Sequence, residues 1–214
     1  MKKVLLLSAV ALFGAMNAQE TKFGAKAGLA LSSMKAKDNF GSLSYDSKAS
    51  FYVGGLVEHK FGGGFAVQGE VLYADLGGKY SQDGVSDKMN IGTLSIPISA
   101  KYYVIENKLN FSAGLNFGFI LSAKEKTELD LGPFGDLGID LEDFGIEDTN
   151  TNESVKDQMN TFNISPFIGA EYNLSFGLFF DARYNFGISN MAKDTTDGQK
   201  LTMNYLQVGV GYKF

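Results

Sequence analysis

The chain has 214 residues with a formal net charge of −5 at pH 7, and it contains no cysteine and one histidine. The lack of cysteine excludes disulfides and thiolate metal sites, and the acidic balance argues against nucleic-acid binding. With 26 glycines, 18 phenylalanines and 3 prolines, the composition favours strands and turns over helices.

The first 18 residues have the parts of a secretory signal peptide: a basic start at Lys2 and Lys3, an apolar run over residues 4–15, and the small residue Ala18 before a polar one. The apolar run is too short for a bilayer helix, which needs roughly 20 apolar residues. A retained anchor is the alternative. We predict cleavage after Ala18 and one mature domain, residues 19–214, whose charge becomes −7 when the two lysines leave.

A period-two alternation of apolar and polar residues dominates the rest of the chain. In residues 206–214, for example, Leu, Val, Val, Tyr and Phe alternate with Gln, Gly, Gly and Lys. Successive side chains of a strand point to opposite faces, so one face is apolar. Eight segments have this pattern, each near the 9–11 residues that a tilted transmembrane strand needs. They are 22–32, 50–60, 65–74, 94–104, 109–119, 162–172, 178–189 and 206–214. Pro97 and Pro166 lack an N–H donor and are predicted at irregularities of the sheet.

Short and long connections alternate between these segments. The short turns are 61–64, 105–108 and 173–177, and the long polar loops are 33–49, 75–89, 124–161 and 190–199. Outer-membrane barrels have short periplasmic turns and longer extracellular loops. We therefore predict an all-β fold: an eight-stranded antiparallel up-and-down transmembrane β-barrel in the outer membrane of a Gram-negative bacterium.

A soluble sandwich or lipocalin-like barrel is the competing fold, because period two alone does not separate the two. The apolar face is nearly unbroken on all eight segments, with His59 at a strand end as the only exception. The opposite face is rich in glycine, which fits a narrow lumen better than a solvated surface. These inward glycines are Gly24, Gly28, Gly54, Gly114, Gly118, Gly169, Gly187, Gly209 and Gly211.

The polar face predicts a charged interior. The inward charged residues are Lys26, Glu58, Glu70, Lys101, Glu171, Asp181 and Arg183. A charge buried alone costs several kcal/mol, so we expect these residues to be paired, and an eight-stranded interior is just wide enough for side chains to fill. Counted from the periplasmic turns, five fall at similar heights: Lys26, Glu70, Lys101, Asp181 and Arg183. We predict that these five form a structural plug; a catalytic or proton-relay cluster is the alternative.

The sequence offers no catalytic constellation, and we predict neither an enzyme nor a cofactor or metal site. His59 is predicted on the lipid side, as a polar tip at the headgroups. The acidic excess lies in one segment, where residues 125–157 hold eleven acids against Lys126 and Lys156. Its three Asp–apolar–Gly repeats do not have EF-hand spacing. We interpret it as a surface loop whose apolar residues dock at the barrel mouth or on a partner.

Four short motifs carry a family resemblance. The segments 23–32, 69–73, 95–97 and 183–184 resemble strands one, three, four and seven of the Bacteroidetes outer-membrane β-barrel family that includes PorT-like proteins. Gly69 stands where that family often has proline. The resemblance implies an outer-membrane barrel, a family mostly of unassigned role, with some members linked to a secretion machinery.

Three functions fit the sequence. One is a structural or interaction barrel with a filled lumen, whose outer loops, chiefly 124–161, meet partners or the environment. A second is an accessory subunit of a secretion or envelope-assembly complex, and a third is a narrow porin-like channel or small-ligand-binding barrel. The expected partners are outer-membrane lipid and envelope or secretion proteins, not nucleic acid. The sequence specifies no oligomeric state.

Overall fold

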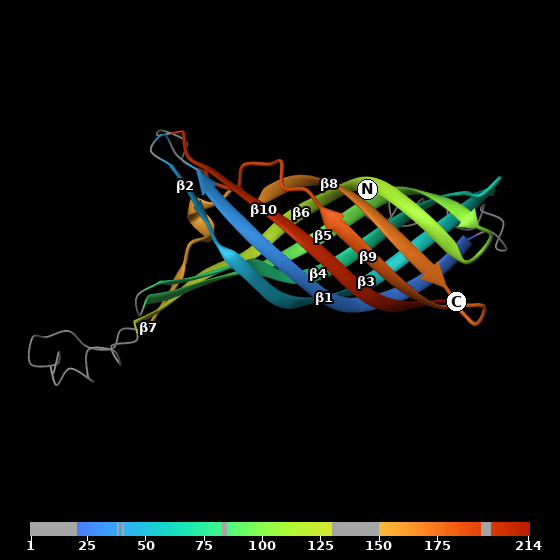
Figure 1. Ribbon diagram of the computed structural model, residues 1–214, viewed down its shortest axis with the longest axis horizontal. Helices are drawn as coiled ribbons and strands as arrows, with labels where there is room; N and C mark the ends of the chain where they lie inside the picture. The colour runs from blue at the N-terminus through green and yellow to red at the C-terminus, as the bar shows by residue number, and fades with distance from the viewer. Residues whose placement is uncertain (1–20, 38, 40, 83–84, 130–149, 194–197) are drawn as a thin grey trace, which may run out of the picture.

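The computed structural model describes residues 21–37, 39, 41–82, 85–129, 150–193 and 198–214, and these form one closed antiparallel barrel (Figure 1). The predicted signal peptide and cleavage point lie outside the described residues. The three Asp–apolar–Gly repeats of the acidic segment, within 130–149, lie outside them as well.

Eight long strands make the ring. They are β1 (Thr21–Lys37), β3 (Asp46–Gly62), β4 (Phe65–Gln82), β5 (Val85–Ile105), β6 (Leu109–Leu129), β8 (Phe162–Asn173), β9 (Leu178–Asn185) and β10 (Lys200–Lys213). Each pairs with its neighbour along the chain, and β10 pairs with β1 from Gly24↔Lys213 to Lys37↔Lys200, which closes the ring. The predicted eight-stranded up-and-down barrel is confirmed.

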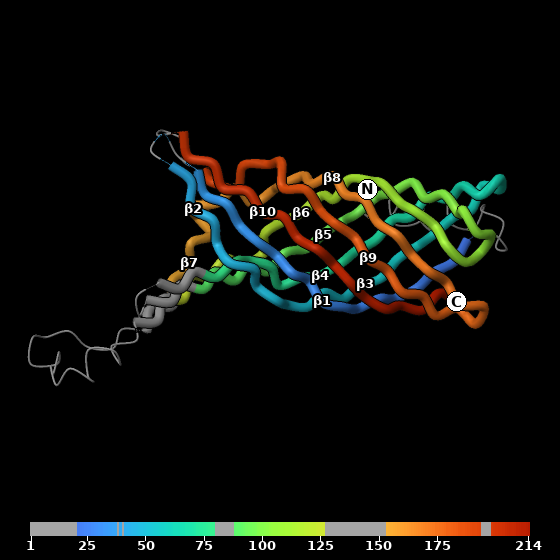
Figure 2. Tube along the Cα trace, in the orientation of Figure 1, coloured from blue at the N-terminus to red at the C-terminus, as the bar shows by residue number. Residues whose placement is uncertain are grey.

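Two short strands and a helical turn lie at the end of the barrel that carries the long connections (Figures 1 and 2). Strand β2 (Ser42–Ser44) pairs with the end of β1, β7 (Asn150–Ser154) pairs with the end of β6, and the 3-10 helix η2 (Lys156–Gln158) follows β7. Among the described residues, no helix is long and apolar enough to cross a membrane.

Most strands extend further on the long-loop side than the alternation predicted. The expected loop at 75–89 is wrong for most of its length, because β4 continues to Gln82 and β5 starts at Val85. The predicted loops at 33–49 and 124–161 likewise contain strand at both ends. The ladder continues past the apolar belt, where the outward residues become polar and the apolar outer face ends, as at Lys35 on β1 and Lys88 on β5.

Strand β9 is shorter than predicted and ends at Asn185 rather than at residue 189. Beyond it, the Ser189 side chain takes over the bonding to β8: its Oγ accepts from the Ile164 N–H at 2.8 Å and donates to the Ile164 carbonyl at 2.9 Å. A side-chain hydroxyl thereby replaces the backbone ladder. Pro97 lies in a gap of the β4–β5 ladder, between the pairs Gly69↔Ile98 and Leu72↔Ser95.

The outer surface of the ring is apolar and the inner surface largely polar. Large hydrophobic side chains such as Leu29, Phe51 and Ile168 are more than half exposed on the outside. Charged side chains such as Lys26, Glu58 and Lys101 are almost completely buried inside. A water-soluble barrel would have the reverse distribution, so the outer surface matches the lipid-facing band of a membrane barrel.

Candidate functional site

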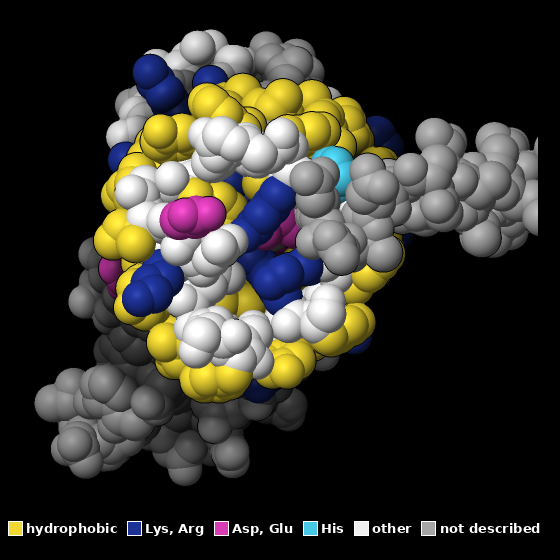
Figure 3. Space-filling model, turned by 90° about the vertical axis from the view of Figure 1, so that its right-hand side faces the viewer, with side chains coloured by type: hydrophobic (Ala, Val, Ile, Leu, Met, Phe, Trp, Pro, Cys, Tyr) yellow, Lys and Arg dark blue, Asp and Glu magenta, His cyan; other side chains and the backbone are white. Residues whose placement is uncertain are grey.

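Eight charged side chains, four acidic and four basic, fill the lumen near the short-turn end. Figure 3 looks into this end and shows Lys, Arg, Asp and Glu side chains in the centre, surrounded by a hydrophobic rim. The eight fall into two groups stacked along the barrel axis. The first is Glu58, Lys101, Glu171 and Lys213, and the second is Lys26, Glu70, Asp181 and Arg183.

The first group, which we call the charge ring, alternates in sign around a closed circuit. Lys101 Nζ lies 2.7 Å from Glu58 Oε2 and 2.8 Å from Glu171 Oε2. Lys213 Nζ lies 2.8 Å from the same Glu58 oxygen and 2.5 Å from Glu171 Oε1. Each ammonium therefore contacts both carboxylates, and each carboxylate contacts both ammonium groups.

The second group, which we call the central charge group, lies one inward step further from the β3–β4 turn. Lys26 Nζ is 3.0 Å from Glu70 Oε2 and 3.1 Å from Asp181 Oδ2. The Arg183 guanidinium donates to both oxygens of Glu70. The Tyr52 hydroxyl donates to Asp181 Oδ1 at 3.2 Å. Every carboxylate of this group is thus bonded.

The two groups come from alternate strands, as the geometry of a closed barrel requires. The charge ring uses β3, β5, β8 and β10, every second strand around the ring, and the central charge group uses β1, β4 and β9 from the intervening set. Inward residues of alternate strands form layers because adjacent strands are staggered. Gln68 links the layers: its Nε2 donates to Glu70 at 2.7 Å and its Oε1 accepts from Lys101 at 2.8 Å.

Aromatic rings pack against three of the four cations. Arg183 lies 4.2 Å from the centre of the Phe167 ring, and Lys213 Nζ lies 4.8 Å from that of Phe179. Both rings are fully buried in the lumen. Such contacts help a buried cation when water is excluded. The charged half of the lumen is therefore filled by bonded side chains.

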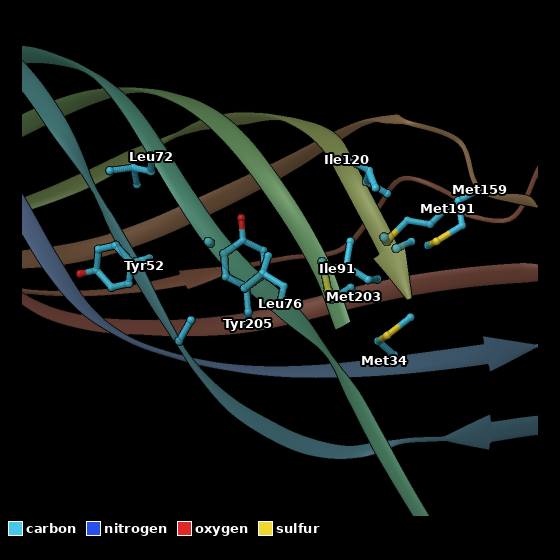
Figure 4. Close-up of a cluster of buried hydrophobic side chains, with 13 residues drawn as sticks. Met34, Tyr52, Leu72, Leu76, Ile91, Ile120, Met159, Met191, Met203 and Tyr205 are labelled. Carbon is cyan, nitrogen blue, oxygen red and sulfur yellow. The ribbon is translucent and has the colours of Figure 1, made fainter. Parts of the chain in front are cut away.

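The lumen changes character toward the long-loop end, where the buried Lys48 is paired with Asp75 at 2.8 Å and apolar side chains predominate. Figure 4 shows this cluster, with side chains from several strands pointing toward one another. Its large members are Met34, Tyr52, Leu72, Leu76, Ile91, Ile120, Met159, Met191, Met203 and Tyr205. The Asn116 Nδ2 donates to the Tyr205 hydroxyl at 2.6 Å, which satisfies a polar group at the base of the cluster.

A cavity of about 600 Å³ lies above this apolar cluster, at the mouth of the barrel. Its apolar lining consists of Ala36, Leu43, Tyr45, Met89, Val155, Met159, Ala192 and Leu201. Its polar lining includes Ser42, Gln158 and Gln199, and its charged lining consists of Lys37, Glu125 and Lys200. Among the described residues, no group of three or more His, Asp or Glu side chains is arranged to hold a metal ion.

The comparisons with known proteins agree with this architecture. The family model for the outer membrane protein beta-barrel domain matches residues 17–193. The chain belongs to this family. No curated protein matches the chain.

Solved structures similar to this chain include Ail, the attachment invasion locus protein of Yersinia pestis. It has a TM-score of 0.52 at 16% identity, over 91% of this chain and 99% of that one. OprG of Pseudomonas aeruginosa has a TM-score of 0.44 at 12% identity, over 91% of this chain and 96% of that one. This outer membrane protein beta-barrel domain is therefore a small barrel of the Gram-negative outer membrane.

The structure places the five predicted plug residues of this outer-membrane barrel in the lumen, but in two layers. Lys26, Glu70, Asp181 and Arg183 form the central charge group, whereas Lys101 belongs to the charge ring. The sequence predicted similar heights for all five; here Lys101 lies in the layer next to that of the other four. The register sets Lys101 opposite Ala66, nearer the β3–β4 turn than Glu70. Counting residues from each turn ignores the stagger between strands.

Sequence reasoning missed Lys213 and the apolar half of the lumen. Lys213 has the same parity as Gln207 on β10, and both are buried, so parity alone identifies it as inward. On the same strand, Met203 and Tyr205 also have inward parity and are buried. Because these two inward residues are apolar, they mark the change from the charged half of the lumen to the apolar half. His59 lies partly buried near the short-turn end, with Nδ1 2.9 Å from Thr21 Oγ1 and its ring against Phe61.

Proposed function

We propose that this outer-membrane barrel is a closed, non-conducting interaction barrel that acts through its extracellular end, and that it is not an enzyme. The observation that carries the proposal is the charge ring. Its four side chains meet across the lumen from four strands, and each is at most 5% exposed. A permeant ion would have to separate buried, mutually bonded charges, which is costly in a narrow low-dielectric interior.

The central charge group and the apolar cluster add two further barriers above the ring. Glu70 and Lys26 are each about 3% exposed, and the large side chains of the apolar cluster fill the lumen above them. Three successive layers favour a filled lumen over a narrow channel. The described elements that lie beyond the membrane band, where a partner can reach them, are β2, β7 and η2.

Planar-bilayer recording tests this proposal directly. The refolded protein is expected to give no steady conductance steps, with a general porin as the positive control. The variant Lys101→Ala removes a cation that contacts two carboxylates and Gln68, so it is expected to raise the frequency of brief openings if it folds. Steady steps from the wild-type protein would overturn the proposal in favour of a channel.

A second proposal is that the barrel belongs to the PorT-like branch and serves a secretion or envelope-assembly complex. It is supported by the motifs noted in the sequence, because they supply three of the four residues of the central charge group: 23–32 holds Lys26, 69–73 holds Glu70, and 183–184 holds Arg183. Affinity capture from gently solubilised membranes tests it. Reproducible recovery of envelope components supports the proposal, and recovery of the barrel alone contradicts it.

A further inference from the structure

The cavity at the mouth of the barrel has the size and lining of a small-molecule site. Its volume of about 600 Å³ falls within the roughly 300–1,000 Å³ typical of ligand pockets. Tyr45, Met89, Val155 and Leu201 line it and also pack against the buried apolar cluster. The floor of the cavity is therefore continuous with a dry apolar layer.

Methionine is concentrated at this site. Five methionines follow the predicted signal peptide: Met34, Met89, Met159, Met191 and Met203. Met89 and Met159 line the cavity, and the other three lie in the cluster beneath it (Figure 4). Methionine is unbranched and polarisable, so it adapts its shape to different apolar partners. A floor of this kind suits apolar ligands of varied outline.

The walls are held in place by hydrogen bonds rather than by loose loop packing. Asn160 Nδ2 donates to the carbonyls of Asn190 at 3.0 Å and Ala192 at 2.9 Å. Asn190 Oδ1 accepts from the Ala192 N–H at 3.0 Å and the Leu201 N–H at 2.9 Å. These two asparagines join the chain before β8 to the chain before β10. A pre-formed pocket loses less free energy on binding than one that must be ordered.

The third wall comes from the segment after β1. Strand β2 folds back and pairs with β1 through Lys35↔Ser44, Ala36↔Leu43 and Lys37↔Ser42. This pairing puts Leu43 and Ala36 on the cavity surface. The polar lining combines Ser42, Gln158 and Gln199 with the charged residues Lys37, Glu125 and Lys200. A ligand with an apolar body and one hydrogen-bonding group matches both parts.

We propose that the mouth cavity binds a small, mainly apolar organic molecule that enters from the outside. The inference rests on the proposed closed barrel, since the charged layers below make the cavity a dead end. The ligand's apolar body lies on Met89, Met159 and Leu201, and its polar group reaches Gln158 or Gln199. The barrel is thereby a surface binding protein for apolar molecules.

The methionines themselves provide the readout. Protein labelled with 13C at the methionine methyl groups and placed in lipid nanodiscs is titrated with 1-naphthol, and glycerol serves as the control without an apolar body. We expect saturable shifts of the Met89 and Met159 signals with 1-naphthol and none with glycerol. Linear shifts without saturation, or equal shifts with both compounds, overturn the proposal.

Matched variants locate the site. Ala36→Phe fills the cavity from β1, whereas Ala25→Phe places the same ring on the exposed lipid side of the same strand. We expect binding at least about tenfold weaker in A36F, because the phenyl group occupies ligand volume, and unchanged binding in A25F. If A36F does not fold, Leu201→Gln makes the floor polar and is expected to weaken binding as well. Unchanged affinity in the folded cavity variant overturns the site.

Different measurements test the closed-barrel proposal and the ligand proposal, so the failure of one can be told from the failure of the other. Conductance is recorded on the same preparation without 1-naphthol. Steady steps overturn the closed barrel whatever the methionine signals do. Silent bilayers together with an absence of saturable shifts overturn the ligand site alone.

Discussion

The Tyr52 side chain occupies the space that a Cβ atom at Gly209 would need, and its hydroxyl is the nearest atom to that position. Gly209 pairs with Gly28 across the β1–β10 seam, and a Cβ at Gly28 would also meet the Tyr52 ring, at 2.8 Å. The two glycines thus leave the space in which the Tyr52 ring packs, and from there its hydroxyl donates to Asp181. Glycine at these positions serves close packing of a lumenal aromatic ring.

Gly209→Ala is therefore expected to destabilise the barrel. The added methyl group meets Tyr52 and the Ala27 carbonyl, and overpacking of this kind costs about 1–3 kcal/mol. Urea titration of the protein in phospholipid vesicles, followed by circular dichroism, measures the free energy of unfolding. The control is Gly55→Ala, whose Cβ would meet only the Gly24 carbonyl, at 3.7 Å. Equal stability of the two variants would contradict the close packing of Tyr52 against Gly209.

The charge ring is expected to tolerate a neutral pair better than a single missing charge. Lys213→Met leaves Glu58 and Glu171 sharing Lys101, and loss of one partner from a buried pair costs about 3–5 kcal/mol. Adding Glu171→Gln restores the balance, so the double variant should be the more stable of the two. The same urea titration checks this order. Lys200→Met, at the exposed rim, should change stability by less than about 0.5 kcal/mol.

The membrane-spanning part of the fold could be predicted from the sequence, because lipid imposes a simple rule on each strand. All eight predicted segments overlap a strand of the ring, and the three predicted turns join β3 to β4, β5 to β6, and β8 to β9. Past the apolar belt, the outward face of a strand meets water and carries polar residues. The outer third of β5, for example, reads Val-Ser-Asp-Lys-Met-Asn-Ile, and its polar residues look like a loop.

The candidate site could be predicted only in part, because parity fixes the direction of a side chain but not its partners. Parity places Lys101 and Glu70 in the lumen, while the register between strands decides that Lys101 meets Glu58 and Glu171. Register depends on all eight strands closing together. The mouth cavity depends on contacts between residues far apart in the sequence, such as the Met159↔Ala192 bridge. The local alternation of apolar and polar residues does not predict such contacts.

A charge on the outer face should cost most near the middle of the membrane band. Leu115, 45% exposed on β6, is separated from the short turn by several residues, whereas Val104 precedes that turn directly. Arginine costs about 2–4 kcal/mol at the bilayer midplane and about 0–1 kcal/mol near an interface. Leu115→Arg should therefore be clearly less stable than Val104→Arg in the vesicle titration. A lower stability of Val104→Arg than of Leu115→Arg would contradict this position of the membrane band.

The absence of cysteine allows the orientation of the barrel to be read chemically. Gln199→Cys places one thiol at the cavity rim, and Glu106→Cys places one in the short β5–β6 turn, where the native side chain is exposed. Because long loops face outward in outer-membrane barrels, a membrane-impermeant maleimide should label Q199C on intact cells. E106C should react only after the outer membrane is permeabilised. Labelling of E106C on intact cells would invert the barrel and place the mouth cavity in the periplasm, which would also remove the outside source of its ligand.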